Sequence, residues 1–234
     1  INLEDAAASK KVIEIKDGAV TRKIGVIDLP SFYSDFGARS AGDKDYRSTT
    51  RDVAKLIAEL KQEGVQGIVV DLRNNGGGSL AEADSMTGLF IDKGPVVQVR
   101  GSHGEVQVQG DDEAGMAWSG PLAVLVNRGT ASASEIFSAA IQDYHRGLVI
   151  GEPTFGKGTV QTLVDLDKFA SGDSEKPQLG ELKMTIQEFF RINGGSTQLK
   201  GVTPDIEFPK NGDEKDFGES TYDNALPWTQ IPPA

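Results

Sequence analysis

The chain has 234 residues, of which 38% are hydrophobic and 25% charged, and it carries a formal net charge of −11. These proportions are typical of a globular domain, and no apolar run approaches the roughly 18 residues that span a bilayer. The acidic balance argues against nucleic acids and anionic membranes as partners, because both favour a basic face. The absence of cysteine excludes disulfides, thiolate metal sites and a cysteine nucleophile.

Strand-like and helix-like segments alternate along the first half of the chain. Alternating or short apolar runs mark strands, and apolar side chains three or four residues apart mark helices. In chain order we expect a linker or edge segment over 1–20, a strand over 23–29, a helix over 53–60, a buried strand over 67–72 and a helix over 79–89. A glycine-rich segment turns the chain between the last two.

The second half continues the alternation and ends in a polar segment. In chain order we expect a hairpin over 96–109, a strand over 122–126, a helix over 132–144, a strand over 148–150 and strands over 160–166 and 182–192. Because strands and helices alternate through the middle of the chain, the sequence predicts an α/β fold with a largely parallel sheet. We expect one core domain over 21–208 and an acidic, proline-containing tail over 209–234.

Ser132 follows a predicted buried strand and opens a predicted helix. Free N–H groups and the helix dipole favour negative charge at that position, so an oxyanion formed by attack of the hydroxyl would be stabilised there. The simpler interpretation is a helix N-cap, because Ser132 and Glu135 have the spacing of a capping box. Local sequence alone favours the N-cap.

A serine nucleophile needs a base, and neither of the two histidines fits. His145 lies on or just past the same helix, about 20 Å further along its axis, and His103 falls in a predicted hairpin turn. Lys157, in a glycine-framed loop ahead of a strand, is the best remaining candidate. It could act only as a neutral amine, so burial would have to lower its pKa. A surface lysine is the ordinary alternative.

Two glycine-rich segments match nucleotide-binding motifs only in part. Residues 151–157 resemble a P-loop, but Gly158 replaces the serine or threonine that binds magnesium, and a strand follows where a helix is needed. Residues 76–81 approach a dinucleotide fingerprint, but three extra residues separate the glycines from the strand and the expected acidic residue is missing. The glycines at 76–78 are better suited to backbone approach toward a ligand oxygen, as half of an oxyanion hole requires.

Three motifs occur in an order typical of one peptidase family. They are Asp71-Leu72-Arg73-Asn74-Asn75-Gly76-Gly77-Gly78, Ser132-Ala133-Ser134-Glu135 and Gly151-Glu152-Pro153-Thr154-Phe155-Gly156-Lys157-Gly158-Thr159-Val160-Gln161. On these motifs the chain resembles the carboxyl-terminal processing peptidases, and most of all their tail-specific members of the bacterial envelope. The resemblance runs from about residue 20 into the tail. It implies a fold related to the crotonase and Clp-type peptidases: a largely parallel sheet flanked by helices, with β-hairpins.

The resemblance also implies catalytic roles. Ser132 and Lys157 would form the family's Ser-Lys dyad. Gln161, four residues after the lysine, would orient the amine. The N–H groups of Gly78 and Ala133 would hold the oxyanion.

Asp143 matches an acidic position of some family members, but three helical turns separate it from Ser132, so we expect only a supporting role. The resemblance implies a serine endopeptidase that cleaves unfolded or C-terminally tagged polypeptides without a metal or other cofactor. Two alternatives stay open: a catalytically idle peptide-binding module, and a crotonase-like acyl-thioester enzyme that uses the glycine-rich turn as its oxyanion hole.

Family members usually carry a PDZ domain ahead of this region, which captures substrate C-termini. No such domain fits within residues 1–20, so we expect it elsewhere in the full-length protein. Polypeptide substrates bound through their C-termini are the expected partners, with an envelope adaptor protein as a further candidate. Because Ile1 is not an initiator methionine and no signal segment starts the chain, we expect a fragment or processed form of a periplasmic or envelope protein.

Overall fold

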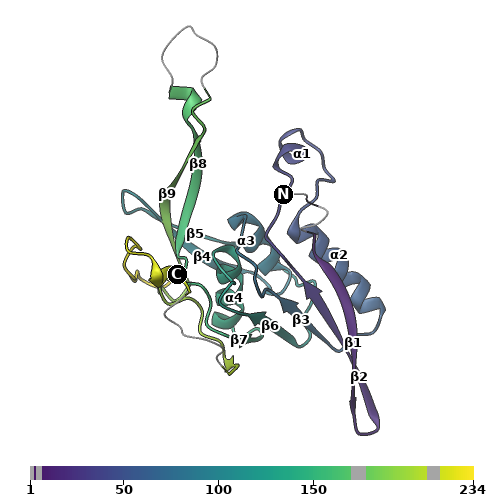
Figure 1. Cartoon of the computed structure of the whole chain (residues 1–234). Helices are drawn as coiled ribbons and strands as arrows, with labels where there is room; N and C mark the ends of the chain where they lie inside the picture. Colours follow the sequence, from purple (N-terminus) through teal and green to yellow (C-terminus); the bar gives the residue numbers. More distant parts are fainter. Residues whose placement is uncertain (1–2, 4–6, 170–177, 210–216) are drawn as a thin grey trace.

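The computed structural model describes residues 3, 7–169, 178–209 and 217–234. Within them, two β-sheets and the helices beside them build the fold (Figure 1). Six strands form one sheet in the order β1-β2-β3-β6-β7-β10, and four form a second sheet in the order β5-β4-β9-β8.

The six-stranded sheet is parallel except for its first strand. Its strands are β1 (Ser9–Asp17), β2 (Val20–Asp28), β3 (Gly67–Asp71), β6 (Leu122–Val126), β7 (Leu148–Gly151) and β10 (Ile206–Glu207). β1 pairs with β2 in antiparallel fashion at one edge, and the remaining neighbours pair in parallel. The carboxyl ends of parallel strands meet at one edge of a sheet. The loops that follow β3 and β6 are therefore neighbours, and these loops carry the glycine-rich turn and Ser132.

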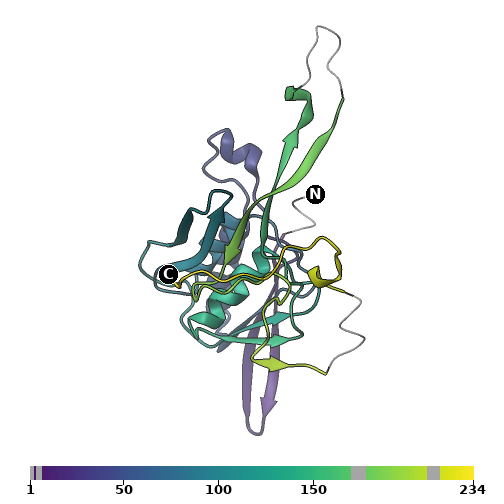
Figure 2. The ribbon, with the colours of Figure 1, turned by 90° about the vertical axis from the view of Figure 1, so that its left-hand side faces the viewer.

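The second sheet is antiparallel and extends into an arm. Its strands are β4 (Gly94–Gly101), β5 (Val106–Asp111), β8 (Thr159–Asp165) and β9 (Glu181–Phe190). β4 pairs only with the last part of β9, from Gln187 onward. The rest of β9 pairs with β8 alone, and this two-stranded arm, with the short 3-10 helix η1 (Leu166–Phe169), points away from the body in both views (Figures 1 and 2). Lys157 lies just before the base of the arm.

The helices are α1 (Phe36–Ser40), α2 (Thr49–Gln62), α3 (Leu80–Gly88), α4 (Ala133–Asp143) and the 3-10 helix η3 (Glu219–Thr221). α2 packs on β1 and β2 of the first sheet, and α3 packs on β4 and β5 of the second. α4 contacts β7 of the first sheet and β4 of the second, and its residues from Ala133 to Ile141 are all buried. A helix buried this completely has little freedom to shift, so the N-terminus of α4 is a fixed point of the fold.

The predicted α/β fold with a largely parallel sheet is confirmed, and the predicted strands and helices occur in the predicted order. The segment 1–20 contributes an edge strand, and α1 and β10 were not predicted. The described end of the chain packs on the body, since Ile231 donates its N–H to the Gly194 carbonyl at 2.9 Å. The domain boundaries stay a prediction. Among the described residues, no helix has the length and apolar character needed to cross a bilayer.

Candidate active site

A cavity of about 450 Å³ opens between the N-terminus of α4, the glycine-rich turn after β3 and the base of the β8–β9 arm. Fourteen residues line it: Phe36, Gly76, Gly78, Ser79, Leu80, Ser132, Ala133, Ile136, Lys157, Thr159, Val160, Gln161, Lys183 and Phe189. Five of the six residues that the sequence singled out are among them, and only Asp143 is not. Tertiary folding thus brings three separate motifs to one solvent-connected space.

Ser132 has a strained backbone. Its φ of 59° and ψ of −116° lie in a region that costs a non-glycine residue about 1–3 kcal/mol. The capping-box arrangement with Glu135 is present, but the Glu135 N–H points at the Ser132 carbonyl oxygen, 2.8 Å away. No capping hydrogen bond of ordinary length holds the hydroxyl. The N-cap and nucleophile interpretations are therefore compatible, because Ser132 also lines the cavity.

Asn75, fully buried, fixes the glycine-rich turn against the Ser132 turn. Its side-chain amide donates to the Leu29 carbonyl at 2.8 Å and accepts from the Gly77 N–H at 2.9 Å. Its own carbonyl accepts from the Ala131 N–H at 2.9 Å. A Cβ on Gly77 would come within 2.8 Å of the Ser132 Cβ, so only glycine lets the two turns approach this closely.

Two residues at this close approach have N–H groups without a hydrogen-bond partner among the described residues. Those of Gly78 and Ala133 belong to lining residues, and neither makes a hydrogen bond within the part of the chain that the structure describes. Two N–H donors without partners, on residues that line one cavity with a serine, are the kind of groups that stabilise an oxyanion.

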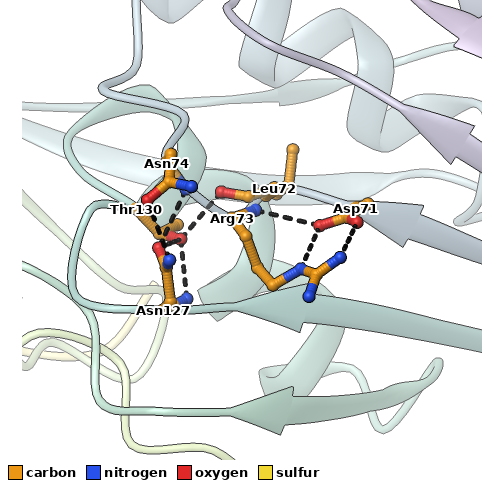
Figure 3. A network of polar contacts seen from close by, with 6 residues as sticks. All are labelled: Asp71, Leu72, Arg73, Asn74, Asn127 and Thr130. Atoms are coloured by element: carbon orange, nitrogen blue, oxygen red, sulfur yellow. Dashed lines mark hydrogen bonds and ion pairs between the residues drawn. The ribbon is translucent and has the colours of Figure 1, made fainter. Parts of the chain in front are cut away.

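Polar contacts outside the cavity join the same two loops (Figure 3). The Asn127 side chain accepts from the Asn74 N–H at 2.8 Å and donates to the Asn74 side chain at 2.9 Å, and the Thr130 hydroxyl donates to the Leu72 carbonyl at 2.8 Å. These bonds hold the loop after β3 against the loop after β6, so the distance between the glycine-rich turn and Ser132 is set from both sides.

Asp71 and Arg73 form a two-point ion pair in the same network (Figure 3). The Nε and Nη2 atoms of Arg73 donate to the two carboxylate oxygens at 2.9 and 2.6 Å. Burial opposes ionisation of Asp71, but the hydrogen bonds and charge of Arg73 outweigh it and hold the pKa of the carboxyl below its usual value. The pair thus stays ionised and rigid at the start of the turn.

Lys157 lines the cavity half-buried, but its amine makes no hydrogen bond to the serine hydroxyl within the described residues. Its Nζ atom donates to the Thr159 carbonyl at 3.2 Å. Burial, and after it the charge of Lys183, lowers the pKa of Lys157, while Glu219 and Glu135 act in the opposite direction. A lowered pKa is what a neutral amine base requires.

Glu135 links the two proposed catalytic residues, and the sequence did not predict this link. One carboxylate oxygen accepts from the N–H groups of Ser132 and Lys157 at 2.7 and 2.9 Å. The other accepts from the Thr154 hydroxyl at 2.6 Å and the Gly156 N–H at 2.7 Å. Burial raises the pKa of this carboxyl to about 7, against the four hydrogen bonds that lower it. The capping-box spacing predicted only the bond to Ser132, since the other three are tertiary.

Replacing Glu135 with glutamine should lower kcat/KM about 10²-fold, because an amide NH₂ cannot accept the hydrogen bonds from the N–H groups of Ser132 and Lys157 that align these two residues.

The pKa of Glu135 is raised in the folded protein, so Glu135 stabilises the fold most below pH 4.5, and this contribution is lost as the pH rises through about 7. Wild-type stability should therefore decline over this interval by at most about 3 kcal/mol relative to Glu135→Gln. Peptide cleavage and urea unfolding between pH 4 and 8 measure both effects.

Glu82→Gln is the matched control. Glu82 is also buried and also occupies the third position of its helix, but its carboxylate accepts from the N–H and hydroxyl of Thr50, at 2.9 and 2.7 Å, away from the cavity. This variant should keep nearly wild-type kcat/KM. Equal losses of kcat/KM in the two variants would show that Glu135 only supports the fold.

Gln161 and Asp143 occupy different surroundings. Gln161 lines the cavity at a bulge in the pairing of β8 with β9, and no hydrogen bond joins its side chain to the Lys157 amine within the described residues. Asp143, at the far end of α4, accepts from Nη2 and Nε of Arg191 at 2.6 and 3.1 Å and from Asn193 at 3.1 Å. Its contacts tie α4 to the segment after β9, outside the cavity.

An α/β fold with a strained serine at a helix N-terminus, a half-buried lysine and two free N–H groups in one cavity has the parts of a serine hydrolase that works without histidine. The comparisons with known proteins agree with this class. The model of peptidase family S41 matches residues 23–208. The chain therefore belongs to peptidase family S41.

Two relatives in this family are named as a tail-specific protease and a C-terminal processing peptidase. The chain is 47% identical to the tail-specific protease of Haemophilus influenzae over 234 residues, which is 100% of this chain and 31% of that protein. It is 35% identical to the chloroplastic C-terminal processing peptidase of Tetradesmus obliquus over 190 residues, or 81% of this chain and 36% of that one. The chain thus spans about a third of the length of these relatives.

Solved structures share the fold. The photosystem II D1 C-terminal processing protease matches with a TM-score of 0.67 and 31% identity over 86% of this chain and 48% of that one. Mature CPAF has a TM-score of 0.64 at 16% identity, covering 86% of this chain and 49% of that one. The predicted peptidase family and fold class are confirmed.

Proposed function

We propose that this chain carries the catalytic centre of a serine endopeptidase that uses a Ser132–Lys157 dyad. The observation that carries the proposal is the single cavity in which the strained serine, the lysine amine and the N–H groups of Gly78 and Ala133 meet. Gln161 borders the same cavity beside the lysine and would orient its amine. Asp143 would support the reaction only through the fold.

The proposed reaction begins when the neutral Lys157 amine takes the proton of the Ser132 hydroxyl. The Ser132 oxygen attacks the peptide carbonyl, and the N–H groups of Gly78 and Ala133 hold the oxyanion. The C–N bond then breaks as the lysine returns its proton to the leaving amine, and water hydrolyses the resulting ester with the lysine again as base. The amine must first exchange its bond to Thr159 for one to the serine. Hydrogen bonds between catalytic groups often tighten in this way only when substrate binds.

The substrates we propose are unfolded or C-terminally tagged polypeptides, as the names of the relatives suggest. An extended chain would reach the cavity as an added strand, presented by its C-terminus. A PDZ domain elsewhere in the full-length protein and an envelope adaptor protein would assist its capture. A periplasmic or envelope location belongs to the same proposal.

The test is incubation of the full-length natural protein with an unfolded polypeptide, together with a fluorophosphonate that phosphonylates reactive serines with loss of fluoride. We expect internal cleavage products by mass spectrometry and a single labelled peptide containing Ser132. Binding without cleavage or labelling would favour the idle peptide-binding module. Hydrolysis of acyl-thioesters in place of peptides would favour the crotonase-like enzyme.

A further inference from the structure

Lysines are the ionisable residues that line the cavity, although the chain is acidic overall. Among the described residues, Lys157 and Lys183 are the ionisable ones that line it, and no acidic side chain does so. The net charge of the chain is −11, so a wall that carries two lysines and no carboxylate differs from the average surface. A lysine pair in one cavity raises the electrostatic cost of charging both amines.

Lys183 faces the cavity because of its register in the arm. It lies on β9 opposite Leu163 of β8, and Thr185, two residues further, lies opposite Gln161. Side chains two residues apart share one face of a strand, so Lys183 projects from the same face of the arm as Gln161. Within the described residues, its ammonium has no hydrogen bond or ion pair, and the side chain is exposed.

We propose that Lys183 is a positioning residue that keeps the Lys157 amine neutral by charge repulsion across the shared cavity. The inference rests on the proposed function, since it names a residue that prepares the proposed base. A positive charge on Lys183, the more exposed lysine, makes protonation of Lys157, the more buried one, less favourable.

The other charged groups that act on Lys157 define how much Lys183 must contribute. Glu135, from α4, and Glu219, from η3, both favour the charged amine, whereas burial and Lys183, from β9, favour the neutral one. Glu135 is buried and held by four donors, and Glu219 accepts from the Gln198 side chain at 3.2 Å. Among the described residues, two carboxylates oppose the effect of burial and one charge, that of Lys183, adds to it.

The test is the pH dependence of kcat/KM for the full-length natural protein with an apolar peptide whose termini are blocked. In this profile kcat/KM should rise with pH as Lys157 loses its proton, and we call this rise the Lys157 limb. Lys183→Met should move the limb to higher pH, so that kcat/KM at a fixed pH on it falls about two- to fivefold. Lys183→Glu should move it further, and Lys183→Arg should restore the wild-type profile. The plateau at high pH should not change, because Lys157 is neutral there in every variant.

A second readout does not depend on activity. In the Ser132→Ala background, lysines carrying ¹³C-methyl groups are titrated by NMR, and the Lys157 signal is assigned by its loss in Lys157→Met. Its midpoint should rise in Lys183→Met and not in Lys55→Met, which removes an equal charge from the exposed side of α2. The difference in the Lys157 midpoint between the proteins with and without Lys183→Met should shrink at high salt.

An unmoved pH limb and an unmoved midpoint in Lys183→Met would overturn the proposal. It would also be overturned if Lys183→Met raised KM only for a peptide with a free C-terminal carboxylate and left the pH profile unchanged, since Lys183 would then contact substrate. If Ser132→Ala retained cleavage, the proposed function would fail, whereas the NMR midpoint would still support or overturn the coupling between the two lysines.

Discussion

Ser132→Ala should lower the cleavage of an unfolded polypeptide by about 10⁴- to 10⁶-fold, the range seen when a covalent nucleophile is removed. No other hydroxyl takes its place at the strained turn beside the free N–H groups of Gly78 and Ala133. The fold should be unaffected, because no capping hydrogen bond of ordinary length depends on this hydroxyl. The measurement is single-turnover cleavage by the full-length protein, with thermal unfolding of both proteins for comparison.

Ser85→Ala is the matched control, since Ser85 is an exposed serine on α3, outside the cavity. It should cleave at the wild-type rate. The nucleophile assignment is refuted if Ser132→Ala cleaves within tenfold of the wild type, or if the serine-directed probe labels both proteins equally.

Lys157→Met should lower kcat/KM by about 10²- to 10⁴-fold, the contribution typical of a general base. Methionine has a similar length but cannot take a proton. Within the part of the chain that the structure describes, the one hydrogen bond lost is that from Nζ to the Thr159 carbonyl, so the free energy of unfolding should change by about 1 kcal/mol or less. A large loss of activity without a loss of stability would separate the catalytic role from a structural one.

The pH dependence gives the Lys157 assignment a sign. Burial lowers the folded pKa of this amine from 10.5, so wild-type activity should rise with pH as the amine loses its proton. The unfolded chain binds the proton more tightly, and wild-type stability should therefore rise relative to Lys157→Met as the pH approaches 10.5.

Lys61→Met is the control, because the Lys61 amine also donates to a backbone carbonyl, that of Ala117 at 2.9 Å, away from the cavity. A wild-type profile that stays flat while chemistry limits the rate would count against Lys157 as the base. So would an unchanged rate in Lys157→Met.

The predicted elements with strong local patterns were those confirmed. The short apolar run that became β3 and the alternating segments that became β8 and β9 identify strands from side-chain period alone. β10 has only two residues and α1 only five, too few for a period to appear. β10 is a strand because it pairs with β7. No sequence pattern within β10 predicts that partner.

The site divides in the same way. Ser132, Lys157 and the glycines were visible in sequence because motifs carry them. Glu135 was visible only as half of a capping box, since its bonds to the Lys157 and Gly156 N–H groups cross more than twenty residues of chain. Lys183 had no motif at all, and only its register opposite Leu163 turns it toward the cavity.

The order of strands and helices, the acidic charge and the residue types at the reacting centre follow from the sequence by itself, because side-chain period and short motifs are local properties. The tertiary structure alone decided that the loops after β3 and β6 meet, that one buried carboxylate joins Ser132 to Lys157, and that the amine rests on Thr159 with a second lysine beside it. These contacts arise from parallel strand pairing and from the packing of α4 between two sheets, and no local sequence pattern encodes either of them.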